Sequence, residues 1–61
     1  MQIRIKTQVK LISSTYDVPK DTLGTIVRMD NEDSDYYIYE VSFNTGVVEH
    51  GVRHYHLEVV S

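Results

Sequence analysis

YYIYEVSF, residues 36–43, is a run in which the side chains alternate with a period of two. Tyr37, Tyr39, Val41 and Phe43 occupy one set of positions, and Ile38, Glu40 and Ser42 occupy the other. A period of two is that of a β-strand, and β-branched and aromatic residues, which strands prefer, dominate the run. The run therefore predicts a strand with one face in the core.

The same period recurs on both sides of this run. In QIRIKTQVKLIS, residues 2–13, Ile3, Ile5, Val9 and Leu11 share odd positions, and one face is expected to point inward. LGTIVRM, residues 23–29, is a shorter run of the same kind. No window of 11 residues carries an apolar stripe with the 3.6-residue period of a helix. The chain is therefore predicted to be all β.

The segments between these runs predict the connections. SSTYDVPKDT, residues 13–22, contains the only proline and is expected to be a long irregular loop. DNEDSD, residues 30–35, reads as a polar turn, and Asn44, Thr45 and Gly46 read as a hairpin. Gly51 is expected to weaken or bulge a strand. The polar residues 53–56 are expected to form a one-turn helix before a last strand.

The order of these segments resembles that of an SH3-like barrel. The matching stretches are VKL, LGTIV, YEVSF, NTGVV and HLEVV, and together they cover about residues 7–60. The pattern is similar to short bacterial SH3-like domains of an uncharacterised family, and more distantly to the KOW motif and to photosystem I reaction-centre subunit IV. The resemblance implies a single domain over residues 1–61, folded as a five-stranded SH3-like barrel with a one-turn helix before the last strand.

The core of such a barrel can be predicted from the inward positions of the runs. The expected core residues are Val9, Leu11, Ile26, Tyr39, Val41, Phe43, Val48, Val52 and Leu57.

Length and charge restrict the class of protein. A chain of 61 residues forms one domain with a small core. The formal net charge of −3 argues against a partner bound mainly through phosphates, because that needs clustered Lys and Arg. No run of roughly 18 apolar residues could span a membrane, and no cleavable leader follows Met1. A cytoplasmic protein is expected, and its oligomeric state is left open.

Three histidines, His50, His54 and His56, lie within seven residues. His50 and His54 have the spacing of zinc ligands on a helix, but Gly51 and the neighbouring valines make a helix there improbable. His54 and His56 could share a side of an extended chain, but a third ligand would have to come from Glu49 or Glu58. We therefore expect no metal site and no cofactor, and we leave open a pH response of the histidines.

Catalysis has no sequence signature in this chain. The serines have no recognisable base beside them, and three glycines, at 24, 46 and 51, make no phosphate-binding loop. We therefore expect a protein that is not an enzyme.

The tyrosines of three predicted loops are the best candidates for a binding site. In SH3-like barrels the corresponding regions converge, so the resemblance would bring Tyr16, Tyr36 and Tyr55 together. Asp17, Asp33 and Asp35 would form an acidic rim that selects a protein partner with a basic surface. The alternative is that each ring only covers the core and leaves its hydroxyl in water.

The sequence is compatible with two functions. The first is a protein-interaction module, either an accessory subunit or a small inhibitor of phage or plasmid type that docks on a larger protein. The second is a KOW-like nucleic-acid-binding barrel, which would need its basic residues on one face: Arg4, Lys6, Lys10, Lys20, Arg28 and Arg53.

Overall fold

The computed structural model describes residues 2–31 and 37–60, and for Asn31 the main chain alone. Five strands and one turn of 3-10 helix follow in chain order: β1 (Gln8–Leu11), β2 (Leu23–Asn31), β3 (Ile38–Phe43), β4 (Val48–Arg53), η1 (His54–His56) and β5 (Leu57–Val59). They form one antiparallel sheet in the order β4-β3-β2-β1-β5. The predicted all-β barrel fold with a one-turn helix before the last strand is confirmed.

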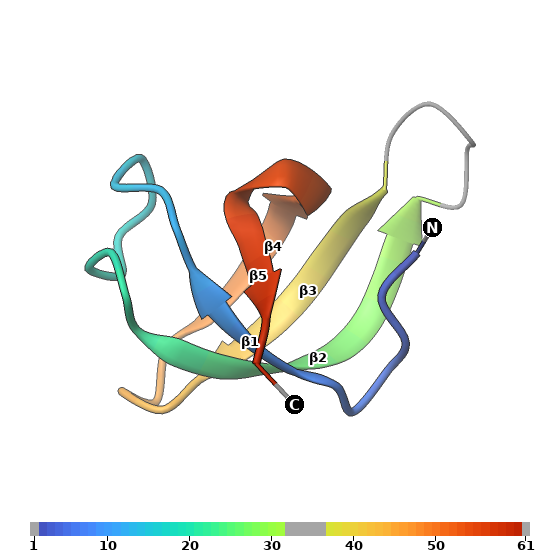
Figure 1. Ribbon diagram of the computed structural model, residues 1–61, viewed down its shortest axis with the longest axis horizontal. Helices are drawn as coiled ribbons and strands as arrows, with labels where there is room; N and C mark the ends of the chain where they lie inside the picture. The colour runs from blue at the N-terminus through green and yellow to red at the C-terminus, as the bar shows by residue number, and fades with distance from the viewer. Residues whose placement is uncertain (1, 32–36, 61) are drawn as a thin grey trace.

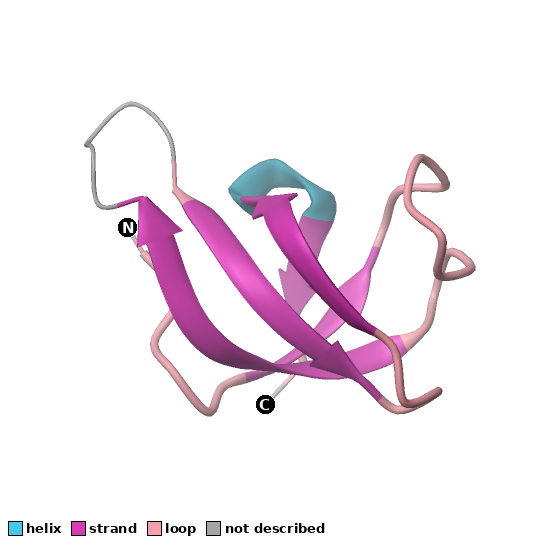
Figure 2. Cartoon of the chain, turned by 180° about the vertical axis from the view of Figure 1, so that it is seen from behind, coloured by secondary structure: helices cyan, strands magenta, loops and turns pink. Residues whose placement is uncertain are grey.

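The sheet coils because β2 is long and irregular. Its first residues pair with β1, and nearly its whole length pairs with β3. Two register shifts, between Ile26 and Arg28 and between Met29 and Asn31, interrupt the pairing with β3. Such bulges bend a strand and increase its twist. Figures 1 and 2 show β2 curving beneath the other strands and η1 joining β4 to β5 across the opposite side.

Gly24 allows the strands to approach closely at the centre of the sheet. It pairs with Val9 on one side and Phe43 on the other. A Cβ atom at this position would lie 2.8 Å from Cδ1 of Phe43 and 2.9 Å from Cγ1 of Val41. The glycine therefore leaves space that the neighbouring core side chains fill.

Among the described residues, ten buried apolar side chains form the core: Ile3, Val9, Leu11, Val18, Ile26, Tyr39, Val41, Phe43, Val52 and Leu57. The prediction was wrong for Val48, whose exposed fraction is 46%. Val48 pairs with Ser42 on the outer face, whereas Val52 pairs with buried Tyr39. In a regular strand Val48 and Val52 would share a face, because they are four residues apart. A register shift between the two pairs adds one residue to β4, so the two valines point to opposite faces.

The first run was also predicted to be more regular than it is. Ile3 is buried but Ile5 is 55% exposed, because β1 begins only at Gln8. A turn precedes it, in which Lys6 has a φ of 76° and the Thr7 N–H donates to the Arg4 carbonyl. This turn interrupts the alternation that the sequence suggested.

Residues 12–22 form the expected long loop, which folds back onto the barrel. Val18, which was not predicted to be in the core, is buried beneath it. The loop is attached by main-chain hydrogen bonds, among them Asp21 N–H to the Leu11 carbonyl and Ile12 N–H to the His56 carbonyl. The second of these connects the start of the loop to η1.

Two predicted turns can be compared with the structure. The hairpin at residues 44–46 is confirmed: the Gly46 N–H donates to the Phe43 carbonyl, and Gly46 has a φ of 92°. In the predicted turn at 30–35, Asp30 and Asn31 belong instead to β2, and the remaining positions lie outside the described residues. No helix in residues 2–31 or 37–60 is long and apolar enough to cross a membrane.

Candidate functional site

The one-turn helix η1 lies between the long loop and β3 and carries two of the three histidines, with Tyr55 between them. The residues on either side, Arg53 and Leu57, have extended backbones, so the helix is limited to a single turn. Two tyrosines from other parts of the chain bind its histidines. The geometry around η1 therefore depends on contacts between distant segments.

Tyr16 binds residues at both ends of η1. Its hydroxyl accepts a hydrogen bond from the Arg53 main-chain N–H at 3.0 Å and lies 2.7 Å from Nδ1 of His56. Because the hydroxyl accepts from Arg53, its own proton is free to be donated to His56 Nδ1. The two rings meet edge to face with their centroids 5.3 Å apart. Tyr16 thus attaches the long loop to the helix.

Tyr39 binds the N-terminal end of η1 in the same way, from inside the barrel. Its hydroxyl accepts from the Ile3 N–H at 2.8 Å and lies 3.0 Å from Nδ1 of His54. Burial raises the pKa of the Tyr39 hydroxyl above its ordinary value, the hydrogen bond from Ile3 acts in the opposite direction, and Tyr37 adds a smaller rise. Each histidine of η1 is therefore held at Nδ1 by a tyrosine hydroxyl that also accepts from a main-chain N–H.

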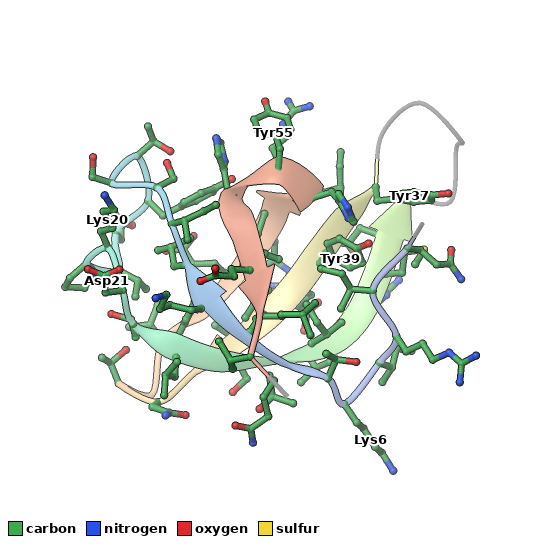
Figure 3. The ribbon with its side chains drawn as sticks, in the orientation of Figure 1. Lys6, Lys20, Asp21, Tyr37, Tyr39 and Tyr55 are labelled. Atoms are coloured by element: carbon green, nitrogen blue, oxygen red, sulfur yellow. The ribbon has the colours of Figure 1, made fainter. Side chains whose placement is uncertain are left out.

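Tyr55 occupies the outer side of η1. Its exposed fraction is 65%, the largest among the exposed large hydrophobic side chains of the described residues. Its ring packs edge to face against His56 with centroids 4.4 Å apart, and Figure 3 shows it pointing away from the barrel. Tyr16, His56 and Tyr55 therefore form a continuous row of rings, which we call the aromatic face.

The aromatic face contains two of the tyrosines that were predicted as binding residues. Tyr16 and Tyr55 both contact His56, which the sequence prediction did not include. Asp17 is exposed beside Tyr16 in the long loop. The other predicted site residues, Asp33, Asp35 and Tyr36, lie outside the described residues. The HYH tripeptide was the available signal for His56, since it places an imidazole on each side of Tyr55.

The alternative, in which each tyrosine ring only covers the core and its hydroxyl stays in water, fits Tyr16 in part. Its ring packs against the core cluster, as that reading expects. Its hydroxyl, however, is held by Arg53 and His56 and does not simply remain in water. Tyr16 therefore supports the aromatic face as well as covering the core.

A second group of side chains lies on the outer face of the sheet. Asp30, Glu40 and His50 each offer one ligand atom, and these atoms lie within 4.8 Å of one another. Nδ1 of His50 is 3.1 Å from Oε1 of Glu40, and Nε of Arg28 is 3.6 Å from Oδ1 of Asp30. The sequence spacing pairs His50 with His54, but Nδ1 of His54 is engaged by the Tyr39 hydroxyl. The predicted absence of a metal site stays a prediction.

A shallow groove runs between the N-terminal segment and β5. Its volume is about 430 Å³, and it is lined by Gln2, Ile3, Arg4, Thr7, His54, Leu57 and Val59. The groove is open rather than enclosed and holds no pair of groups arranged for acid–base chemistry. We therefore assign no reaction to it.

The basic side chains are dispersed over the described surface. Nζ of Lys10 lies 3.3 Å from a Glu58 carboxylate oxygen, and Arg28 faces Asp30. Figure 3 shows Lys6 and Lys20 pointing outward from opposite sides of the molecule. A phosphate-binding surface needs such groups together.

Comparison of the chain with protein-family models, curated proteins and solved structures gave no match. The resemblance to SH3-like families stays a prediction.

Proposed function

We propose that this chain is a non-enzymatic protein-interaction module that docks on a larger protein through its aromatic face. The observation that carries the proposal is the arrangement of Tyr55, which is 65% exposed while its ring is packed on His56. Tyrosine offers a large amphipathic contact area at a small cost in conformational entropy, and it is enriched at protein interfaces. An exposed and supported tyrosine is therefore a suitable binding anchor.

The hydrogen bonds behind Tyr55 support the same proposal. Tyr16 holds His56, and it is itself held by the Arg53 main chain. The groups that support Tyr55 are thus ordered before any partner arrives. Ordering side chains on association costs about 0.5–1.5 kcal/mol for each side chain, so a preordered face retains more of its contact energy.

The charge of the chain favours a partner with a basic surface. The formal net charge is −3, and Asp17 is exposed next to Tyr16. Complementary charges at the edge of an interface accelerate association and exclude partners of the same sign. An accessory subunit and a small inhibitor of phage or plasmid type are both forms that such a module could take.

The nucleic-acid alternative is less well supported. It needs a surface of clustered cations, whereas Lys10 and Arg28 face carboxylates and Lys6 and Lys20 point to opposite sides. A protein partner is therefore the better proposal.

The test begins with affinity purification of the tagged chain, which should retain one stoichiometric protein. With that partner, Tyr55→Ala should weaken binding by about 1–3 kcal/mol, because it removes an anchor and leaves the core unchanged. Calorimetry measures the loss, and an unchanged melting temperature confirms the fold. Val48→Ala is the matched control, since Val48 is also exposed but lies on β4.

The acidic rim is tested by a second variant that carries both Asp33→Asn and Asp35→Asn. Rim charges act mainly on association rate, so this variant should bind more slowly at low salt with little change in dissociation rate. The proposal would be contradicted if Tyr55→Ala and the double aspartate variant both bound normally while substitution of Arg4 or Lys6 abolished binding. That result would favour nucleic-acid binding.

A further inference from the structure

Asp30, Glu40 and His50 come from three neighbouring strands, β2, β3 and β4. They are the one group in residues 2–31 and 37–60 whose histidine and carboxylate atoms lie close enough together to share a metal ion. Glu40 alternates with buried Tyr39 and Val41, so it points to the outer face of the sheet. The group is independent of the aromatic face.

Two bulges bring the outer residues to Glu40. In β2, Asp30 is the additional residue between the pairs Met29–Tyr39 and Asn31–Ile38. In β4, His50 and Gly51 both lie opposite Glu40, and Gly51 has a φ of 74°. A bulge changes the direction in which a side chain points, and bulges are frequent beside functional sites. Each neighbouring strand thus contributes a redirected side chain.

The donor atoms indicate the class of ion. One imidazole nitrogen and two carboxylate oxygens form a mixed set that suits zinc-like divalent ions, whereas calcium and magnesium prefer oxygen ligands alone. Zinc binds such atoms at about 2.0–2.2 Å, which puts the ligand atoms roughly 3.5 Å apart. The ligand atoms lie within 4.8 Å of one another, so small side-chain rotations bring them to that spacing.

We propose that Asp30, Glu40 and His50 bind one zinc-like divalent ion on the outer face of the sheet, with water completing its coordination. The ion would bind between His50 Nδ1 and Glu40 Oε1, which are 3.1 Å apart. It would also compete with Arg28 for Asp30. The His50 and Arg28 side chains are each 72% exposed, so both can move when the ion binds.

This proposal departs from the expectation of no metal because the set of ligands is different. The sequence suggested His54 as a partner of His50, or His54 and His56 with Glu49 or Glu58. Of these residues only His50 belongs to the present group. An ion bound here would connect three adjacent strands. Because it binds only the folded chain, it should also raise the melting temperature.

The first experiment is calorimetric titration of the chain with zinc chloride, followed by amide NMR spectra. We expect one ion per chain, with spectral changes centred on Asp30, Glu40 and His50. His50→Ala and Glu40→Gln should each weaken binding at least tenfold and abolish the rise in melting temperature. Glu49→Gln is the matched control, since it removes one carboxylate beside His50 that is not in the group, and it should bind normally.

A second pair of variants tests the role of Arg28. Arg28→Gln should strengthen binding several-fold because it frees Asp30. Lys20→Gln removes the same charge in the long loop, away from the site, and should have little effect. If Arg28→Gln and Lys20→Gln strengthened zinc binding equally, the effect would come from net charge, and the proposed site would be refuted.

Three other results would also overturn the proposal. They are the absence of saturable binding at millimolar zinc, spectral changes centred on His54 and His56, and unchanged binding by His50→Ala. His50→Ala decides the question even if Glu40→Gln disturbs the fold, because the His50 side chain is mostly exposed and its removal leaves the core intact.

Discussion

Two tyrosine hydroxyls in this chain have the same role. Tyr16 and Tyr39 each accept a hydrogen bond from a main-chain N–H more than thirty positions away, and each faces Nδ1 of a histidine in η1. A tyrosine ring can be buried at low cost when its hydroxyl has a partner. These two residues therefore connect the N-terminal segment, the long loop and the helix.

Tyr39→Phe should lower the free energy of unfolding by about 1–3 kcal/mol, because it leaves the Ile3 N–H and His54 Nδ1 without their shared partner. Urea unfolding measures the change. Tyr55→Phe removes a hydroxyl from a mostly exposed side chain and is the control. Equal stability of the two variants would mean that the Tyr39 hydroxyl contributes nothing.

The raised pKa of Tyr39 predicts a dependence of stability on alkaline pH. Folding disfavours the tyrosinate, so the stabilisation is present below the ordinary value of 10.0 and is lost as pH rises through the higher folded value. The free energy of unfolding, measured at a series of pH values, should fall less steeply above pH 10 in Tyr39→Phe than in the wild type. Identical slopes would contradict the burial of this hydroxyl.

At the scale of elements, the bulges in β2 and β4 determine which side chains face outward. Val52 pairs with Tyr39 only because β4 contains an additional residue at the bulge that includes Gly51. Gly51 has a φ of 74°, a conformation that other residues adopt at a cost. The hairpin and the β1–β2 pairing, in contrast, follow regular registers.

Gly51→Ala should cost about 1–2 kcal/mol through backbone strain alone, since the nearest atom to an added Cβ is 4.0 Å away, on Ile38. Chemical denaturation measures this loss. If our zinc proposal holds, the same variant should also weaken zinc binding, because it changes the bulge that positions His50. An unchanged stability would show that β4 reaches its register without a positive φ.

Gly24→Ala should destabilise for a different reason. Its added Cβ would lie 2.8 Å from Phe43 and 2.9 Å from Val41, both in the core. Crowding of this kind costs about 1–3 kcal/mol, and NMR signals of the Phe43 ring should shift. Those ring signals should move much less in Gly51→Ala, where the nearest atom to the added Cβ is 4.0 Å away, on Ile38.

At the scale of the molecule, stability depends on one core, to which ten side chains of residues 2–30 and 37–60 contribute. Phe43→Ala should cost about 3–5 kcal/mol, a large part of what a domain of this size has. Val48→Ala should stay within about 0.5 kcal/mol, because Val48 is on the outer face. Thermal melting compares them, and a wild-type melting temperature for Phe43→Ala would refute the core assignment.

Local patterns in the sequence determined much of this fold. The alternation from Tyr37 to Phe43 predicted β3 and its buried face, and Asn44 to Gly46 predicted the hairpin, because strand period and turn chemistry depend on adjacent residues. The resemblance to an SH3-like barrel supplied the expectation that Tyr16, Tyr36 and Tyr55 converge, and of these Tyr16 and Tyr55 both contact His56. His56, which contacts both rings, was missed because its role depends on a residue forty positions away.

The tertiary structure alone decided where the alternation fails. The turn at Lys6 exposes Ile5, and the bulge in β4 exposes Val48, because register depends on the partner strand. The same dependence explains why Asp30, Glu40 and His50 could not be grouped from the sequence. Each belongs to a different strand, and only two bulges in the paired sheet bring them together.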